Sequence, residues 1–222
     1  MQENITKFLS IDKTLASDIF FGCKYPHEAL GKIKDYVYKL GERLNSDLFY
    51  STDDGIWIAK SARVSPTATI VAPCIIDENA EIRQCAFIRG SAIIGKNAVV
   101  GNSTELKNVI LFDNVQVPHY NYVGDSILGY KAHMGASAIT SNVKMDKNTV
   151  YIDYGDGRFD SALKKLGAVI GDNVEVGCGA VLNPGSVIGK CSRIYPLSAV
   201  RGYVEENTVY KSYGNTERID GR

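Results

Sequence analysis

From residue 58 onward, an aliphatic side chain returns at every sixth position of the chain. The first block contains Ile58, Val64, Ile70, Ile76, Ile82, Ile88, Ile94, Val100 and Leu106, and a second block contains Ile170, Val176, Leu182, Ile188, Ile194 and Val200. Small residues stand four positions after most of these aliphatics: Ala62, Ala68, Cys74, Ala80, Ala86, Ala92, Ala98, Thr104, Ala180, Ser186, Ser192 and Ser198. A helix repeats at about 3.6 residues and a long strand at about two, so neither element explains the spacing.

A spacing of six suits short strands joined by tight turns, with three strands in each coil. The aliphatic side chain then points inward, and the small residue fits the cramped corner. The pattern therefore predicts an all-β fold, a left-handed parallel β-helix of hexapeptide repeats, over residues 56–205. This handedness is an exception to the usual right-handed crossover. In such a coil, residues 18 apart lie above one another, about 4.8 Å away.

The repeat has two kinds of interruption. The spacing shortens by one between Leu106 and Leu111, and again between Val123 and Leu128. It disappears over about 143–168, where an Asp-Gly turn between polar segments predicts a projecting loop or hairpin. Such loops often carry function, and a plain exposed insertion is the alternative.

The residues before the coil show helical rather than hexapeptide spacing. Leu30, Ile33, Val37, Leu40 and Leu44 predict an amphipathic helix. We expect residues 1–55 to form a helical cap over the open end of the solenoid, with His27 solvated near its start, and residues 206–222 to form a C-terminal tail.

Composition excludes several classes of protein. The 222 residues carry 25 basic and 25 acidic side chains, so nothing indicates binding to nucleic acid or to a charged membrane surface. No apolar run is long enough for a membrane span, and the first residues lack the core of a signal peptide. The five cysteines form no CxxC pair, which favours a reducing cytoplasm.

Charged and titratable residues gather on neighbouring turns of the predicted coil. Arg89 and Lys107 each follow an inward aliphatic and lie 18 residues apart, so two cations stack. A phosphate would relieve their repulsion, although both side chains could simply point into water. Counting through the shortened turn places Glu105 beneath Tyr122. It also places His119 one turn below Ala136.

A histidine in this cluster can be a general base or a structural hydrogen-bonding residue. A zinc site needs three converging histidines, and His27 lies outside the coil, so we expect no metal.

The stretch GNSTELKNVILFDNVQVPHYNYVGDSILGYKAHMGASAITSN, residues 101–142, carries three motifs at family spacing. It resembles the acetyltransferase domain of bifunctional N-acetylglucosamine-1-phosphate uridyltransferase/glucosamine-1-phosphate acetyltransferase, a hexapeptide-repeat acyltransferase. That family shows G-N-x-x-E-x-K, H-x-x-Y-x-G-D and I-G-A-G-x-I-T-x-N. The uridyltransferase domain, with its glycine-rich signature, is not expected in this chain.

The resemblance implies a role for each matching residue. His119 would accept a proton, Arg89 and Lys107 would hold the sugar phosphate, and Tyr122 would contact the sugar. His133 stands where the family has a substrate-contacting asparagine. The predicted acetyl-CoA contacts are Ala136, Asn142, Val143 and Cys178, although Val143 begins a stretch that departs from the family's Y-D-G. From the stacking alone, Glu105 is predicted to orient the imidazole or the amine.

The implied activity is acetyl-CoA-dependent N-acetylation of an amino-sugar phosphate such as glucosamine 1-phosphate, as in UDP-N-acetylglucosamine biosynthesis. His119 would take the proton of the 2-amino group, no metal would be needed, and the protein would be a homotrimer. Two alternatives stay open: an acetyltransferase acting on another sugar acceptor, and a non-catalytic trimeric solenoid that binds sugar phosphates.

Overall fold

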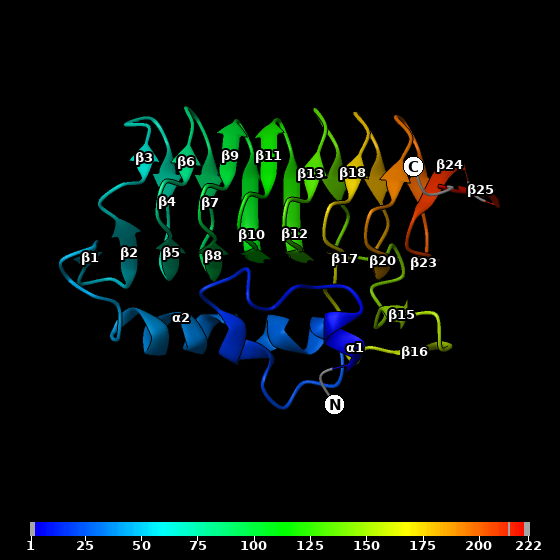
Figure 1. Ribbon diagram of the computed structural model, residues 1–222, viewed down its shortest axis with the longest axis horizontal. Coiled ribbons are helices and arrows are strands. Elements are labelled where there is room, and N and C mark those ends of the chain that lie inside the picture. Colours follow the sequence, from blue (N-terminus) through cyan, green and yellow to red (C-terminus); the bar gives the residue numbers. More distant parts are fainter. Residues whose placement is uncertain (1–2, 213, 220–222) are drawn as a thin grey trace.

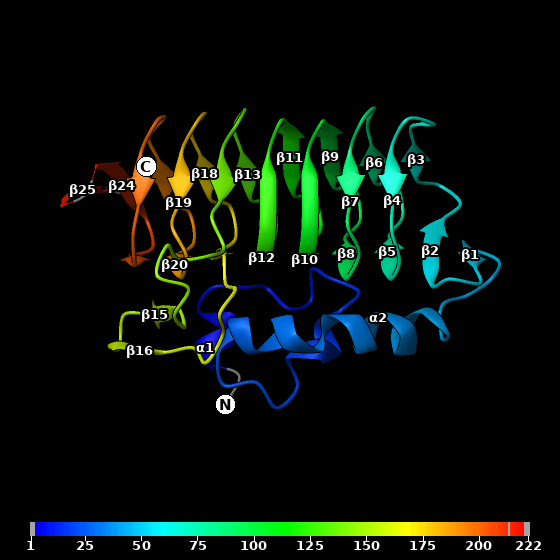
Figure 2. The same cartoon turned by 180° about the vertical axis from the view of Figure 1, so that it is seen from behind.

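The computed structural model describes residues 3–212 and 214–219, and most of them belong to a solenoid of short parallel strands joined by turns (Figure 1). In Figure 1 the strands β9 and β11 rise on the near side, and Figure 2 shows β10 and β12 on the opposite side. The chain advances along the axis with a left-handed turn. The predicted left-handed parallel β-helix is therefore confirmed.

The coils present three faces, each a ladder of parallel strands. Face A contains β2 (Ile56–Ala59), β5 (Cys74–Ile76), β8 (Ala92–Ile94), the ends of β10 (Glu105–Leu111) and β12 (Tyr122–Leu128), β17 (Ala168–Ile170), β20 (Ser186–Ile188) and β23 (Tyr203–Val204). Face B contains β3 (Arg63–Val64), β6 (Glu81–Ile82), β9 (Val99–Asn102), β11 (Gln116–His119), β13 (His133–Met134), β18 (Glu175–Val176), β21 (Arg193–Ile194) and β24 (Thr208–Ser212). Face C contains β4 (Thr69–Ile70), β7 (Phe87–Ile88), the starts of β10 and β12, β14 (Ile139–Thr140), β19 (Val181–Leu182) and β22 (Ala199–Val200).

Antiparallel strands flank the two ends of the ladders. At the N-terminal end β1 (Phe49–Thr52) pairs with β2, and at the C-terminal end β25 (Asn215–Arg218) pairs with β24. Because β24 pairs in parallel with β21, the face B ladder continues past residue 205. Pairing at both ends reduces the number of free strand edges.

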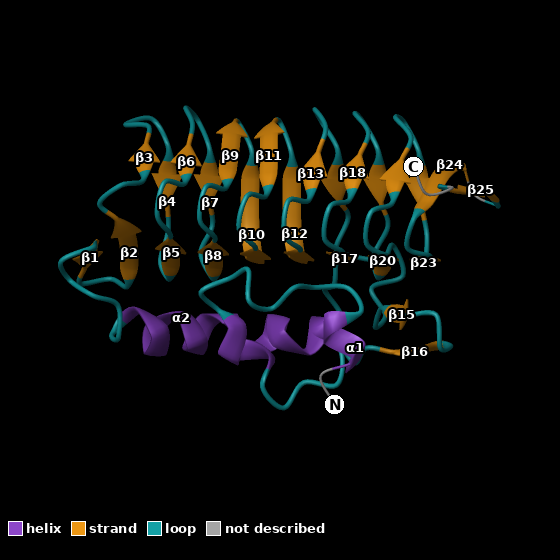
Figure 3. Ribbon diagram, in the orientation of Figure 1, coloured by secondary structure: helices purple, strands orange, loops and turns teal. Residues whose placement is uncertain are grey.

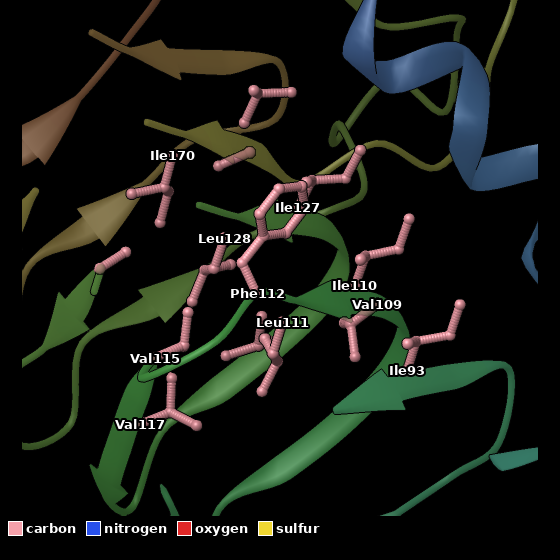
Figure 4. Close-up of a cluster of buried hydrophobic side chains, with 14 of the residues drawn as sticks. Ile93, Val109, Ile110, Leu111, Phe112, Val115, Val117, Ile127, Leu128 and Ile170 are labelled. Atoms are coloured by element: carbon pink, nitrogen blue, oxygen red, sulfur yellow. The ribbon is translucent and has the colours of Figure 1, made fainter. Parts of the chain in front are cut away.

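The inward positions are those that the repeat indicated. Figure 4 shows Leu111, Leu128 and Ile170 among the core side chains, and these three occupy successive paired positions. The corner residues Ala80, Ala98 and the other small residues after the first coil are also buried. The residue before a corner alanine adopts a left-handed backbone, for example at Asn79 (φ 57°) and Asn97 (φ 56°), a conformation that asparagine tolerates.

The N-terminal segment lies along face A and not over the open end, so the predicted position of the cap is wrong. Its helices run beside the solenoid in Figure 3: α1 (Glu3–Thr6), η1 (Ser17–Phe20), η2 (Pro26–Lys32) and α2 (Ile33–Gly41). Face A alone has a continuous column of outward aliphatic residues, and all of them are fully buried: Ile75, Ile93, Ile110, Ile127, Val169 and Val187. Covering this column removes more apolar surface from water than covering the end would.

The insertion after β14 forms a hairpin of β15 (Tyr151–Asp153) and β16 (Arg158–Asp160) that folds back onto the molecule. The side chain of Tyr154, which follows β15, is almost fully buried and stacks on Tyr25 with ring centroids 4.7 Å apart. His27 is only 4% exposed, and its Nδ1 lies 3.0 Å from the Tyr154 hydroxyl. The expectation that His27 is solvated is therefore wrong, because the hairpin covers it.

Candidate active site

The two shortened intervals of the repeat lie at one corner of the coil, between faces C and A. There β10 and β12 are seven-residue strands that each continue from face C into face A. The two strands pair with each other before and after the corner residues, Asn108 in β10 and Asp125 in β12. Both residues have a left-handed backbone, with φ of 53° and 46°. The tighter corner stacks their side chains, and the Asn108 amide donates to Asp125 Oδ1 at 3.0 Å.

Asp125 is the centre of a buried hydrogen-bond network at this corner. Asp125 is 4% exposed, and each of its two carboxylate oxygens accepts a hydrogen bond from Lys107 Nζ at 3.0 Å. The amide of Asn142 donates to Oδ2 at 2.5 Å. A buried carboxylate with a cation and two amides is well satisfied. The network thus joins Lys107, a predicted phosphate contact, to Asn142, a predicted acetyl-CoA contact.

Tyr122 lies against this network. A side chain on Gly124 would place its Cβ 2.6 Å from the Tyr122 hydroxyl and 2.9 Å from Asn142 Nδ2, so the Tyr122 and Asn142 side chains would have to move to admit it. Burial raises the pKa of the Tyr122 hydroxyl, and the nearby carboxylates of Asp125 and Glu105 raise it further. The phenol therefore stays protonated and can donate a hydrogen bond.

Glu105 sits directly beside Tyr122 in the ladder, as the count along the repeat predicted. Its Oε1 accepts from Arg89 Nη1 at 2.7 Å, and this hydrogen bond raises the pKa of the guanidinium. Both side chains are partly exposed, at 45% for Arg89 and 33% for Glu105. In the described part of the chain, Glu105 forms no hydrogen bond with His119. Each of the two predicted phosphate contacts is thus paired with a carboxylate.

His119 lies at the end of β11, at the corner between faces B and C, with its side chain exposed. Its backbone is held on both sides: the N–H donates to Asn121 Oδ1 at 3.1 Å, and the carbonyl accepts from Ser137 N–H at 3.0 Å. Asn121 is buried and donates to the carbonyls of Gly135 and Ala138. The imidazole is therefore free to meet a ligand while its backbone stays fixed.

Ala136 and Cys178 continue the column of His119 on the next two coils. Gln116 pairs with His133, and His133 pairs with Glu175, so positions 119, 136 and 178 share one register. The Gly179 N–H donates to the Ala136 carbonyl at 2.8 Å. Cys178 is exposed and its thiol is free. These two predicted acetyl-CoA contacts thus follow His119 along a single corner.

The remaining predicted residues lie apart from one another. His133 is on face B, where its Nδ1 is 2.7 Å from Glu175 Oε2, whereas the Asp125 network lies at the corner between faces C and A. Val143 is 44% exposed and follows Asn142 into the insertion.

Within residues 3–212 and 214–219, no group of three or more potential ligands from His, Cys, Asp and Glu is arranged to hold a metal ion. None of the helices in the same residues is long and apolar enough to cross a membrane.

The GMPPB C-terminal domain family matches residues 70–190, more than half of the chain and the whole of the corner just described. The chain belongs to this family. The match begins and ends inside the solenoid, so the N-terminal segment lies outside it.

Curated relatives extend the comparison. "Bifunctional protein GlmU" of Methanococcus maripaludis (strain C5) is 37% identical over 127 residues, which cover 57% of this chain and 31% of that protein. The "Bifunctional sugar-1-phosphate nucleotidylyltransferase/acetyltransferase" of Sulfurisphaera tokodaii is 29% identical over 177 residues, covering 70% of this chain and 44% of that protein. The chain therefore spans less than half the length of these relatives. They confirm the predicted resemblance to a bifunctional sugar-phosphate acetyltransferase family.

Solved structures with a similar course of the chain include the polySia specific acetyltransferase NeuO, at 14% identity and a TM-score of 0.47, covering 75% of this chain and 88% of that chain. The acetyltransferase domain of PglB from Neisseria gonorrhoeae has 15% identity and a TM-score of 0.31, covering 75% of this chain and 69% of that chain.

Sequence reasoning missed three residues of the site: Asn108, Asn121 and Asp125. For Asn108 and Asp125 the signal was present, because each stands inside one of the two shortened intervals. The six-residue spacing shortens by one residue at two successive turns of the same corner. Such a repeated change indicates that the backbone geometry of this corner differs from the rest of the coil. Asn121 gave no such signal, since its role depends on carbonyls of the next coil.

Proposed function

We propose that this chain is an acetyl-CoA-dependent N-acetyltransferase that acts on an amino-sugar phosphate such as glucosamine 1-phosphate. The observation that carries the proposal is the network in which buried Asp125 joins Lys107 to Asn142 beside Tyr122. The exposed His119 lies only a few residues before Tyr122. A relative named as a sugar-1-phosphate nucleotidylyltransferase/acetyltransferase supports both the transferred group and the acceptor class.

The reaction needs one bond formed and one broken. The lone pair of the sugar 2-amino group attacks the thioester carbonyl carbon, and a C–N bond forms. His119 accepts the proton that the amine loses. The tetrahedral intermediate collapses, the C–S bond breaks, and the CoA thiolate leaves with a proton from the imidazolium or from solvent. A backbone N–H near Ala136 would stabilise the oxyanion.

The chain's own residues divide between the two substrates. Arg89 and Lys107 would hold the phosphate, and the Tyr122 hydroxyl would donate to the sugar. On the donor side, the corner of His119, Ala136 and Cys178 would carry the acetyl-thioester arm. Asn142, followed by Val143, would contact the same molecule from the other corner.

Acetyl-CoA consumption measured against glucosamine 1-phosphate, glucosamine 6-phosphate and glucosamine tests the proposal. We expect the highest kcat/KM with the 1-phosphate, and identification of the product by mass spectrometry as the N-acetyl sugar. Absence of turnover with all three acceptors, together with tight binding of a sugar phosphate, would instead favour a non-catalytic solenoid.

One observation favours a second candidate, an acetyltransferase for another sugar acceptor. Arg89 is paired with Glu105 and Lys107 with Asp125, so these four side chains together carry no net charge. A cluster without net charge attracts a phosphate dianion only weakly. An acceptor without a 1-phosphate monoester would therefore lose less binding affinity here than a dianion would. A higher kcat/KM for a nucleotide-linked amino sugar than for glucosamine 1-phosphate would establish this alternative.

A further inference from the structure

A hollow of about 290 Å³ lies at the N-terminal end of the solenoid, where Figures 1 and 2 show the end of α2 beside the strands β1 and β2. Its volume is close to the lower limit of small-molecule sites, which is roughly 300 Å³. The lining includes side chains that follow α2 and side chains of the two strands: Glu42, Leu44, Ser46, Phe49, Ser51 and Trp57. We refer to it as the tryptophan hollow.

Trp57 is the largest side chain of the tryptophan hollow, and its ring is held in place. A side chain on Gly41 would place its Cβ 2.3 Å from the indole, so the end of α2 lies directly against the ring. The rings of Tyr38 and Trp57 meet edge to face, with centroids 6.2 Å apart. The indole remains partly exposed and lines the hollow. A ligand therefore meets an aromatic surface whose position is fixed before binding.

The polar groups around Trp57 are available to a ligand. Within residues 3–212 and 214–219, the side chains of Glu42, Ser46 and Ser51 form no hydrogen bond or ion pair, and neither does the indole N–H. Ser51 pairs with Trp57 across the ladder, so both side chains lie on the same face of the sheet. The indole only donates, a carboxylate only accepts, and a serine hydroxyl does both. A ligand hydroxyl, which also does both, satisfies every one of them.

The charge of the lining disfavours an anionic ligand. Among the described residues that line the tryptophan hollow, Glu42 carries the only charge. A single carboxylate repels a phosphate or another carboxylate, and the lining offers no cation to bind either group. Leu44, Phe49 and Trp57 add apolar surface, against which the C–H groups of a ligand pack. The lining therefore fits a neutral molecule with several hydroxyl groups and an apolar C–H face, and a sugar ring has both.

We propose that the tryptophan hollow binds a neutral saccharide, with one sugar ring against Trp57 and its hydroxyl groups hydrogen-bonded to Glu42, Ser46 and Ser51. The ring belongs either to a free sugar or to one unit of a longer glycan, because both present hydroxyl groups around the same kind of ring. This binding does not depend on the proposed acetyltransferase function.

The tryptophan hollow is separate from the candidate active site. Trp57 pairs with Ile75, and Ile75 pairs with Ile93. Ile93 pairs with Ile110, which lies in the same strand as Lys107. The hollow thus lies three coils away, which is about 14 Å along the axis. It also lies outside residues 70–190, which match the family model. A single sugar ring in the hollow therefore does not reach Lys107.

Trp57 is the one tryptophan of the chain, so its fluorescence reports on this hollow alone. We expect a saturable change in emission with glucose and with N-acetylglucosamine, excited at a wavelength that tyrosine does not absorb. Isothermal titration calorimetry with the same sugars gives a second measurement of the affinity. Glucose 6-phosphate should bind more weakly than glucose, because the Glu42 carboxylate repels it. Tighter binding of cellobiose than of glucose assigns the hollow to a glycan unit, and equal binding assigns it to a free sugar.

Glu42→Gln and Ser51→Ala test the hydrogen bonds. Both side chains are exposed, so we expect the variants to fold as the wild type does. Each variant should lose roughly two- to tenfold in affinity for glucose, the range for one hydrogen bond. Asp47→Asn is the matched control, because it neutralises an exposed carboxylate of the same connection outside the hollow. Its affinity for glucose should equal that of the wild type.

Three results would overturn the proposal. The first is the absence of a saturable signal in both measurements at millimolar sugar, and the second is tighter binding of glucose 6-phosphate than of glucose in the fluorescence titration. The third is an equal loss of affinity in the two lining variants and in Asp47→Asn. His119→Ala should bind glucose as the wild type does, so failure of the acetyltransferase function and failure of this site are distinguishable.

Discussion

The backbone of His119 is fixed by Asn121 and Ser137, while its imidazole is exposed at a corner of the coil. The effect of a His119 substitution on catalysis can therefore be measured without a large effect on stability. For a buried histidine the two effects would occur together, because its removal leaves a cavity. At His119 a substitution removes only what the ring does for a ligand.

We therefore expect His119→Ala to lower turnover by about 10²–10⁴-fold, the range for losing a positioned general base. Its thermal midpoint should match that of the wild type, because no core contact is lost. Tyr50→Ala, at a residue of β1 that is 64% exposed and lies away from this corner, is the control and should keep its turnover. Near-normal turnover in His119→Ala would remove the proposed base from the mechanism.

Asp125 is a second test at this scale, since it is proposed to position Lys107 and Asn142. Asp125→Asn keeps a residue that tolerates the left-handed backbone but places an amide among donors. We expect kcat/KM to fall by roughly ten- to 100-fold, corresponding to one lost charged hydrogen bond. The KM for acetyl-CoA should rise, because Asn142 loses its charged acceptor and competes with Lys107 and Asn108 for a single amide oxygen.

Asp172 provides the matched control for this variant. Its carboxylate is also buried and lies 3.0 Å from a lysine, Lys190, but it binds Ser10 of the N-terminal segment instead of the site residues. Asp172→Asn should lower the thermal midpoint about as much as Asp125→Asn does. It should leave the KM for acetyl-CoA and the KM for the sugar acceptor unchanged. Equal kinetic effects in the two variants would show that Asp125 acts only on stability.

At the scale of elements, the contact between the N-terminal segment and the hairpin depends on a buried histidine. Burial lowers the pKa of His27, and the nearby carboxylate of Glu28 opposes this only in part. The other groups around the ring are Tyr25, Tyr154 and Phe159, none of which can balance a positive charge there by carrying a negative one near neutral pH. The contact is therefore more stable with a neutral imidazole than with a protonated one.

The sign of the pH effect follows. Below the pH of about 6.5 at which a free histidine titrates, the unfolded chain binds a proton that the folded chain excludes. Stability is then lost as the pH falls through that window. Between pH 7 and pH 5 we expect the thermal midpoint of the wild type to fall relative to that of His27→Phe, since the raised pKa values of Asp77 and Asp113 act in the opposite sense on both proteins alike. An equal change of the midpoint with pH in the two proteins would contradict the role of His27.

At the scale of the whole molecule, one corner of the solenoid shows apolar side chains in strained positions. Leu197 is 84% exposed with φ of 58°, and Tyr120 is 63% exposed with φ of 51°. A left-handed backbone costs a non-glycine residue about 1–2 kcal/mol. Both residues lie on the corner that carries His119, Ala136 and Cys178. We propose that copies of the chain meet at this corner in a homotrimer.

Sedimentation velocity at micromolar concentration should then give three times the mass of one chain. Leu197→Asn should shift the equilibrium toward monomer and lower turnover, while the folded monomer gains stability because asparagine tolerates this backbone. Leu48→Asn, which changes a leucine that is 50% exposed in the N-terminal segment, is the control and should remain trimeric. A fully active wild-type monomer would refute the trimer.

The sequence by itself determined the solenoid and the register of its ladders. A period of six leaves one arrangement of inward aliphatics, so counting placed His119 one turn below Ala136 and Glu105 beneath Tyr122, as the structure shows. The tertiary structure decided which partners the charged side chains take, since Lys107 pairs with Asp125 rather than remaining a free cation above Arg89. It also decided the position of the N-terminal segment and the burial of His27. The contacts between this segment and the hairpin join residues more than 100 positions apart, such as Tyr25 and Asp156, and no local period constrains such pairs.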